Sequence, residues 1–90
     1  MPTVKFTNAL KRYFPDLKDT AAKEISIAAI LSEMETSYPG LRSYLLDEQG
    51  NLRKHVNIFI DGTMITNRAA LNFTIDEKSE VFIIQALSGG

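Results

Sequence analysis

Apolar and polar residues alternate along several stretches of the chain, with the period of two that is typical of a strand with one buried face. The alternation runs through residues 3–7 and 53–60, which are predicted strands, and the mainly apolar residues 81–87 are predicted as the last strand. Residues 20–25 are predicted as a further strand, although their two alanines have low β propensity. The core-facing positions of the first, third and last strands are expected to be Val4, Phe6, Val56, Ile58, Ile60, Val81 and Ile83.

One main amphipathic helix is predicted to follow Ser26. The Ser26 hydroxyl can cap the helix by accepting a hydrogen bond from a free N–H in its first turn. Pro39-Gly40 then ends the helix, and residues 41–46 are predicted to form one short helical turn. Between these signals, apolar residues at helical spacing form a single stripe of Ile27, Ile30, Leu31, Met34, Tyr38 and Leu41.

Turn signals divide the remaining chain. Asp61-Gly62 directly follows a predicted strand and indicates a tight hairpin, whose return strand would begin at Met64 and Ile65. Residues 8–18 are interpreted as a mixed connector with a turn at Pro15-Asp16. Further turns are predicted at residues 47–51 and 76–79, and residues 67–73 are expected to be irregular or to form a short helical turn.

The predicted order is strand, strand, helix, strand, short strand, strand. One amphipathic helix can cover only one face of a sheet, so the other face should meet solvent. We therefore expect an α+β fold with a mixed sheet of four to five strands and one main helix across one face. The first and last strands are expected to lie side by side in its centre.

Composition narrows the classes of function. The 90 residues include ten Lys and Arg against eleven Asp and Glu, so the net charge of −1 does not indicate a nucleic-acid or acidic-membrane partner. The absence of Cys excludes disulfides and Cys-ligated zinc. The longest apolar run has five residues, 27–31, and the N-terminal residues lack a signal-peptide core. A soluble cytoplasmic protein without a membrane contact is expected.

Three other groups of residues were weighed as sites. His55 is the only His, and without a nucleophile or acid partner it is interpreted as a solvated side chain. Asp76, Glu77 and Glu80 lack the spacing of a calcium loop, so no metal site is predicted. The basic and aromatic residues at 11–14 are too few, in a near-neutral chain, to indicate nucleic-acid binding.

The sequence ends in Ser88-Gly89-Gly90 after an apolar strand. This ending can be a frayed terminus or a cloning remnant. The alternative is that the Gly90 carboxylate is itself the reacting group. Gly89 and Gly90 have no Cβ, so they permit close approach by a partner and backbone angles closed to other residues. We favour this alternative, and we expect residues 1–87 to form the domain and residues 88–90 a flexible tail.

Three stretches carry a resemblance to a known family: SIAAIL at 26–31 with YPGL at 38–41, VNIFIDG at 56–62, and SEVFII at 79–84 followed by ALSGG at 86–90. Together with the predicted order of elements, they resemble the MoaD/ThiS family of sulfur carriers, which have the ubiquitin-like β-grasp fold. The resemblance covers the whole chain, and residues 52–58 look most like carriers of the cysteine-biosynthesis type. The chain departs from many relatives at Gln85-Ala86, where they have Pro, and at Ser88, where they have Ala.

The resemblance implies a protein cosubstrate rather than an enzyme. An E1-like adenylyltransferase of MoeB/ThiF type would adenylate the Gly90 carboxylate, using ATP and magnesium that the carrier itself does not bind. Conversion to a thiocarboxylate would let the chain, a monomer when free, donate sulfur to a synthase. Cysteine, molybdopterin (with this chain as the small subunit of its synthase) and thiazole or other thio-compounds all remain open as products.

Two other functions share parts of this pattern. A ubiquitin-like modifier would use the same activation chemistry but join Gly90 to lysines of other proteins. A β-grasp interaction domain would have an incidental Gly-Gly end.

A docking surface for the partner is predicted beside the tail. If Val81 and Ile83 face the helix, then Phe82 and Ile84 lie on the open face of the sheet. Phe59 joins them there when Ile58 faces inward. The predicted partner-binding residues are Phe59, Phe82, Ile84, Leu87 and Ser88, and the predicted reacting residues are Gly89 and Gly90.

Overall fold

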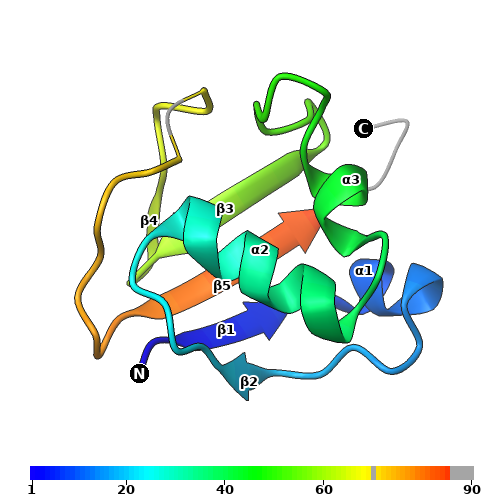
Figure 1. Ribbon diagram of the computed structural model, residues 1–90, viewed down its shortest axis with the longest axis horizontal. Coiled ribbons are helices and arrows are strands. Elements are labelled where there is room, and N and C mark those ends of the chain that lie inside the picture. The colour runs from blue at the N-terminus through cyan, green and yellow to red at the C-terminus, as the bar shows by residue number, and fades with distance from the viewer. Residues whose placement is uncertain (70, 86–90) are drawn as a thin grey trace.

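The computed structural model describes residues 1–69 and 71–85. In this part of the chain a five-stranded sheet with the order β2-β1-β5-β3-β4 carries helices on one side (Figure 1). The strands are β1 (Thr3–Phe6), β2 (Thr20–Ala21), β3 (Val56–Ile60), β4 (Thr63–Met64) and β5 (Glu80–Gln85). The helices are α1 (Asn8–Tyr13), α2 (Ile27–Ser37) and α3 (Leu41–Leu45). The predicted α+β class and mixed sheet are confirmed.

The last strand occupies the centre of the sheet. β5 pairs in parallel with β1, where Val4 lies opposite Val81, and antiparallel with β3, where Ile58 lies opposite Ile83. The expected adjacency of the first and last strands is therefore confirmed. β5 is paired on both sides as far as Ile83, and its end at Gln85 pairs with Val56 of β3.

Helix α2 covers one face of the sheet and supplies much of the core (Figure 1). Ser26 caps it as predicted, since its Oγ accepts a hydrogen bond from the Ala29 N–H at 3.2 Å. Gly40, with a φ of +96°, ends this segment in the left-handed conformation that favours glycine. The predicted apolar stripe faces the sheet, with Tyr38 half-buried and the other five residues, Ile27, Ile30, Leu31, Met34 and Leu41, buried.

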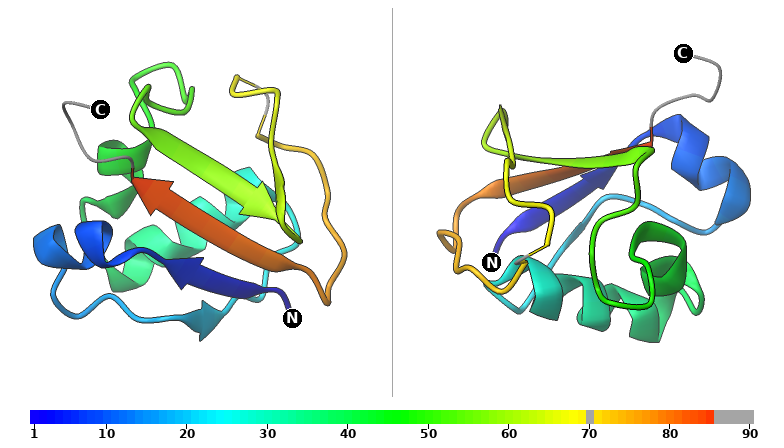
Figure 2. Two further views of the ribbon diagram at one scale, coloured as in Figure 1. Left: turned by 180° about the vertical axis from the view of Figure 1, so that it is seen from behind. Right: turned by 90° about the horizontal axis from the view of Figure 1, so that it is seen from above.

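The opposite face of the sheet is open. Figure 2 shows, from behind, that β1, β5 and β3 lie in front of α2, and from above that α2 and α3 share one side of the sheet, while α1 lies beside the end of β1. The alternation along the strands follows this division: Val81 and Ile83 are fully buried, whereas Phe82 is 37% exposed. The predicted register, on which the docking surface depends, is confirmed.

The Asp61-Gly62 hairpin also follows the prediction. Ile60 pairs with Thr63, which leaves a two-residue loop, and both loop residues have positive φ, 51° and 85°. This is the geometry of a type I′ turn, whose twist matches that of the strands it joins. The return strand β4 covers only Thr63–Met64. It therefore begins one residue before the predicted start at Met64 and does not include Ile65.

Three further elements differ from the prediction by more than one residue. Residues 8–18 contain the helix α1 instead of only a mixed connector, and it packs through the fully buried Leu10. β2 has two residues, because the chain turns away at Lys23, whose N–H donates to the Glu33 carboxylate at 2.9 Å. β3 begins at Val56, three residues after the predicted start. No helix of the described residues is both long and apolar enough to cross a bilayer. The predicted domain boundary at residue 87 lies outside the described residues.

Candidate functional site

The site is built where β5 ends. Gln85, the last described residue of this strand, lies opposite Val56 of β3. The predicted site residues Leu87, Ser88, Gly89 and Gly90 lie outside the described residues, so their assignment stays a prediction. The structure does describe the strand end from which they continue and the sheet face beside it.

Side chains from two helical segments hold the end of β5. The Tyr44 hydroxyl, on α3, donates a hydrogen bond of 2.8 Å to Oε1 of Gln85. The backbone N–H of Gln85 donates to Oγ1 of Thr7, the cap residue of α1, at 3.4 Å. Sequence reasoning did not identify Tyr44, because a Tyr within a short helical turn carries no signal of a partner 41 residues away.

The neighbouring end of β3 is held by Arg68. Its guanidinium donates to Oδ1 of Asn57 at 2.6 Å and to the carbonyl of Val56 at 2.7 Å, and it also donates to the carbonyl of Arg53. Since Val56 is the residue opposite Gln85, this half-buried side chain stabilises the strand beside the end of β5. No sequence motif indicated this role for Arg68.

The predicted docking residues meet on the open face. Phe82 lies directly opposite Phe59 in the β3–β5 pair, and Ile84 lies one pleat further toward the end of β5. Phe82 is exposed, while Phe59 and Ile84 are half-buried. Met64 extends the row, because it pairs with Phe59 across the hairpin, and it is 47% exposed. We call Phe59, Met64, Phe82 and Ile84 the open-face cluster; the hairpin register could have identified Met64.

A shallow hollow of about 320 Å³ lies over this cluster. Apolar side chains supply most of its walls, and Glu80 stands at its edge; the lining residues are Phe59, Gly62, Glu80, Phe82 and Ile84. An exposed apolar depression of this kind suits a partner's apolar side chain.

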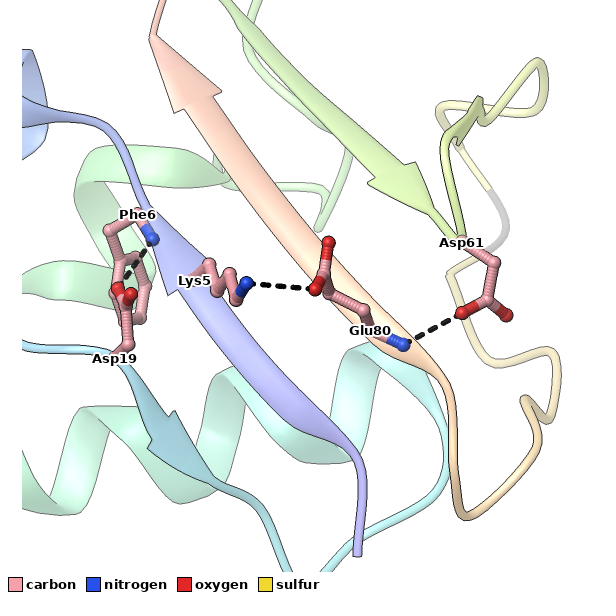
Figure 3. Close-up of polar contacts among 5 residues, drawn as sticks. All are labelled: Lys5, Phe6, Asp19, Asp61 and Glu80. Carbon is pink, nitrogen blue, oxygen red and sulfur yellow. Dashed lines mark hydrogen bonds and ion pairs between the residues drawn. The ribbon is translucent and has the colours of Figure 1, made fainter.

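Charged groups border the cluster at the end of the sheet away from Gln85 (Figure 3). Lys5 Nζ lies 2.9 Å from Oε1 of Glu80, and that hydrogen bond and charge raise the pKa of the Lys5 ammonium. Oδ1 of Asp61 accepts from the Glu80 N–H at 2.9 Å, which lowers the pKa of the Asp61 carboxyl. Lys5 lies opposite Phe82 across β1 and β5, so a polar border adjoins the apolar cluster.

Of the other residues considered as sites, Glu80 borders this surface. His55 is exposed, as interpreted, and its ring meets that of Tyr44 edge-on with centroids 6.1 Å apart. Glu80 is engaged with Lys5, and Asp76 accepts from the N–H of Lys78. In residues 1–69 and 71–85, no group of three or more His, Cys, Asp or Glu side chains is placed to hold a metal.

Comparison with known proteins identifies a family model that matches this chain. The model of the ThiS family matches residues 4–90. The sulfur carrier protein CysO of Mycobacterium tuberculosis (strain ATCC 25618 / H37Rv) is 27% identical, with 98% of this chain and 97% of that protein covered, and CysO of Mycobacterium bovis matches equally well.

Solved structures give the same fold. The crystal structure of CysO from M. tuberculosis superposes with a TM-score of 0.80 at 25% identity, covering 97% of this chain and all of that one. CysO in the BexX/CysO complex of Amycolatopsis orientalis gives 0.83 at 20% identity, with both chains covered in full. The small archaeal modifier protein 1 of Methanosarcina acetivorans gives 0.77 at 20% identity, covering 99% of this chain and 95% of that one. The predicted ubiquitin-like β-grasp fold is thereby confirmed.

Proposed function

The chain belongs to the ThiS family, and from this premise we propose that it is a sulfur carrier protein, the function named for its mycobacterial relatives. In this proposal an E1-like adenylyltransferase of MoeB/ThiF type activates the Gly90 carboxylate, which then becomes a thiocarboxylate. The chain is a protein cosubstrate, and its partner supplies the ATP site, the magnesium and the catalysis. Similarity to the CysO proteins over 98% of the chain supports a carrier of the cysteine-biosynthesis type.

The observation that carries the proposal is the extent of the family match. It begins at residue 4 and reaches residue 90, so it includes the last strand, Gly89 and Gly90 as well as the core. The central place of β5 in the sheet supports it further. A strand paired on both sides gives the residues that follow it a defined starting point for delivery into a partner.

The chemistry explains why such a chain needs a partner. A carboxylate is a poor acyl donor, because its carbonyl carries negative charge and lacks a good leaving group. Attack of the Gly90 carboxylate on the α-phosphorus of ATP releases pyrophosphate and forms an acyl-adenylate. Sulfide or a persulfide then attacks the acyl carbon, AMP leaves, and a thiocarboxylate forms; a persulfide adduct must also be cleaved reductively.

We propose that the adenylyltransferase docks on the open-face cluster. Phe82 and Ile84 lie on the same strand that leads to the tail, so a partner bound there is beside the reacting end. The hollow over Phe59 and Phe82 offers apolar contact area that the described fold does not cover. Leu87 and Ser88 would contact the same partner as the tail enters its active site.

The test compares the wild-type chain with Gly90→Ala in ATP–pyrophosphate exchange, using an E1-like adenylyltransferase from the same host. We expect the variant to lose most of the exchange while its thermal unfolding stays unchanged, because the added Cβ affects only the reacting end. Undiminished exchange by Gly90→Ala would contradict the proposal. The wild-type product, after sulfur transfer, should gain the mass difference between one sulfur and one oxygen atom. Recovery of the chain in high-mass conjugates from its host would instead support the ubiquitin-like modifier.

A further inference from the structure

Tyr44 brings together parts of the chain that are distant in sequence. Its ring is half-buried on α3 and meets the ring of Tyr13 with centroids 5.2 Å apart. It also meets Phe14 edge-on at 5.7 Å and His55 edge-on at 6.1 Å. Edge-to-face pairs at these distances are favourable and orient the rings. The ring of Tyr44 therefore has a defined position between the end of α1 and the start of β3.

The hydroxyl of this oriented ring is directed at the end of β5. It donates to Oε1 of Gln85 at 2.8 Å, while Thr7 Oγ1 accepts from the Gln85 N–H. Backbone pairing with Val56 fixes Gln85 on the β3 side. Gln85 is thus held by β3, by the cap of α1 and by α3, although it lies at a strand end, where pairing normally weakens.

The hydroxyl is not needed to build the core. The ring contacts of Tyr44 would be the same for Phe, and a half-buried hydroxyl can exchange its protein partner for water at little net cost. The hydroxyl instead orients the side-chain amide of Gln85, because it donates a hydrogen bond to the oxygen of that amide.

We propose that Tyr44 is a positioning residue for the reaction at Gly90. By holding Gln85, its hydroxyl sets the position and orientation of the residue that precedes the reacting end. This inference rests on the proposed function. A preset departure point lowers the conformational entropy that binding must remove, so it raises the rate of adenylation rather than the stability of the fold.

Tyr44→Phe tests this inference, because it removes the hydroxyl and keeps the ring. We expect kcat/KM for adenylation to fall about two- to tenfold, the range of one hydrogen bond, with only a small decrease in the melting temperature. Gln85→Met should lose as much, because its thioether is only a weak acceptor, whereas Gln85→Glu keeps a strong acceptor and should retain the rate. The double variant Tyr44→Phe with Gln85→Met should lose no more of kcat/KM than either single variant, because both changes remove the same hydrogen bond. Tyr13→Phe removes a hydroxyl from the same aromatic group and serves as the matched control.

A chain ending at residue 85 separates positioning from docking, because it lacks every residue that follows Gln85. If Tyr44 acts only through the residues after Gln85, then Tyr44→Phe will not change the affinity of this shortened chain for the adenylyltransferase. An equal loss of affinity in the shortened chain, additive losses in the double variant, or a wild-type rate for Tyr44→Phe would each overturn the inference. A wild-type rate for Tyr44→Phe would leave the proposed function intact. Failure of the wild-type chain to be adenylated would overturn both this inference and the proposed function.

Discussion

At the scale of single residues, Asp61 shows how one carboxylate joins two elements. Its φ of 51° lies in the left-handed region, which Asp tolerates better than most residues. Hydrogen bonds from the Glu80 N–H and from the Ser79 side chain favour the ionised carboxylate and lower the pKa of Asp61. In its charged form, the side chain connects the β3–β4 hairpin to the start of β5 (Figure 3).

We expect the free energy of unfolding to decrease as the pH falls below 3.8, the ordinary pKa of an Asp carboxyl. The folded-state pKa of Asp61 is lower than the unfolded one, so the unfolded chain takes up the proton first. The stabilisation is complete above the unfolded pKa and is lost as the pH falls through the folded value. Asp61→Asn keeps an acceptor and tolerates the same backbone but cannot titrate. In urea titrations, the advantage of the wild type over Asp61→Asn should shrink with falling pH.

Glu35 provides the control for this experiment. Its pKa is also lowered, by hydrogen bonds from the backbone N–H groups of Gly40 and Arg42, so it contributes acid sensitivity at a different place. Glu35→Gln should remove its own share and leave that of Asp61. A difference between wild type and Asp61→Asn that stays constant across the acid range would contradict the assignment.

Residue-scale prediction from sequence succeeded where the interaction is local. Ser26 was identifiable because an N-cap bonds to the N–H three residues later, and Ala29 is that residue. Tyr44 was not identifiable, since its partner Gln85 is brought near only when α3 packs beside the end of β5. Arg68 was missed for the same reason.

At the scale of elements, periodicity predicted the parts that have one strongly apolar face. α2 buries a regular set of side chains, so its sequence shows the period of the structure. β5 was identifiable as a short run of apolar residues instead, because residues on both of its faces are apolar. Helix α1 was missed because it has six residues, of which only Leu10 is buried, and so it has no repeat to detect. β2 was predicted too long because Glu33 of α2, not the local sequence, ends it by accepting from the N–H groups of Lys23 and Glu24.

The two faces of β5 should respond differently to the same substitution. Ile83→Ala removes a fully buried side chain and should lower the free energy of unfolding by about 2–5 kcal/mol. Phe82→Ala mainly removes cross-strand contacts with Lys5 and Phe59, each worth roughly 0.2–1 kcal/mol, so about 1 kcal/mol is expected. Urea unfolding of both variants measures the difference. A larger loss for Phe82→Ala than for Ile83→Ala would mean that the register is inverted.

At the scale of the whole molecule, the fold separates stability from recognition. The helices and the core-facing side chains of the sheet form one apolar cluster, while the opposite face carries its own apolar residues without contributing them to that core (Figure 2). The sequence predicted this division, because alternation assigns each strand residue to a face and a single main helix can cover only one. It did not predict Met64, which the hairpin register could have placed, or the ion pair of Lys5 and Glu80, which depends on the register between β1 and β5.

This separation leads to a prediction about the complete carrier. If the open-face cluster supplies docking and Gly90 supplies the reaction, then a chain ending at residue 87 will bind the adenylyltransferase without reacting. It should inhibit adenylation of the full chain competitively.

Phe82→Ala in the shortened chain should weaken that inhibition about tenfold or more, as expected for an aromatic side chain central to an interface. Thr36→Ala, at an exposed position of α2 on the other side of the sheet (Figure 2), serves as the control. If the Phe82→Ala variant of the shortened chain inhibits as strongly as the unsubstituted shortened chain, then the docking surface does not include Phe82. If the shortened chain does not inhibit at all, then the tail itself provides the affinity.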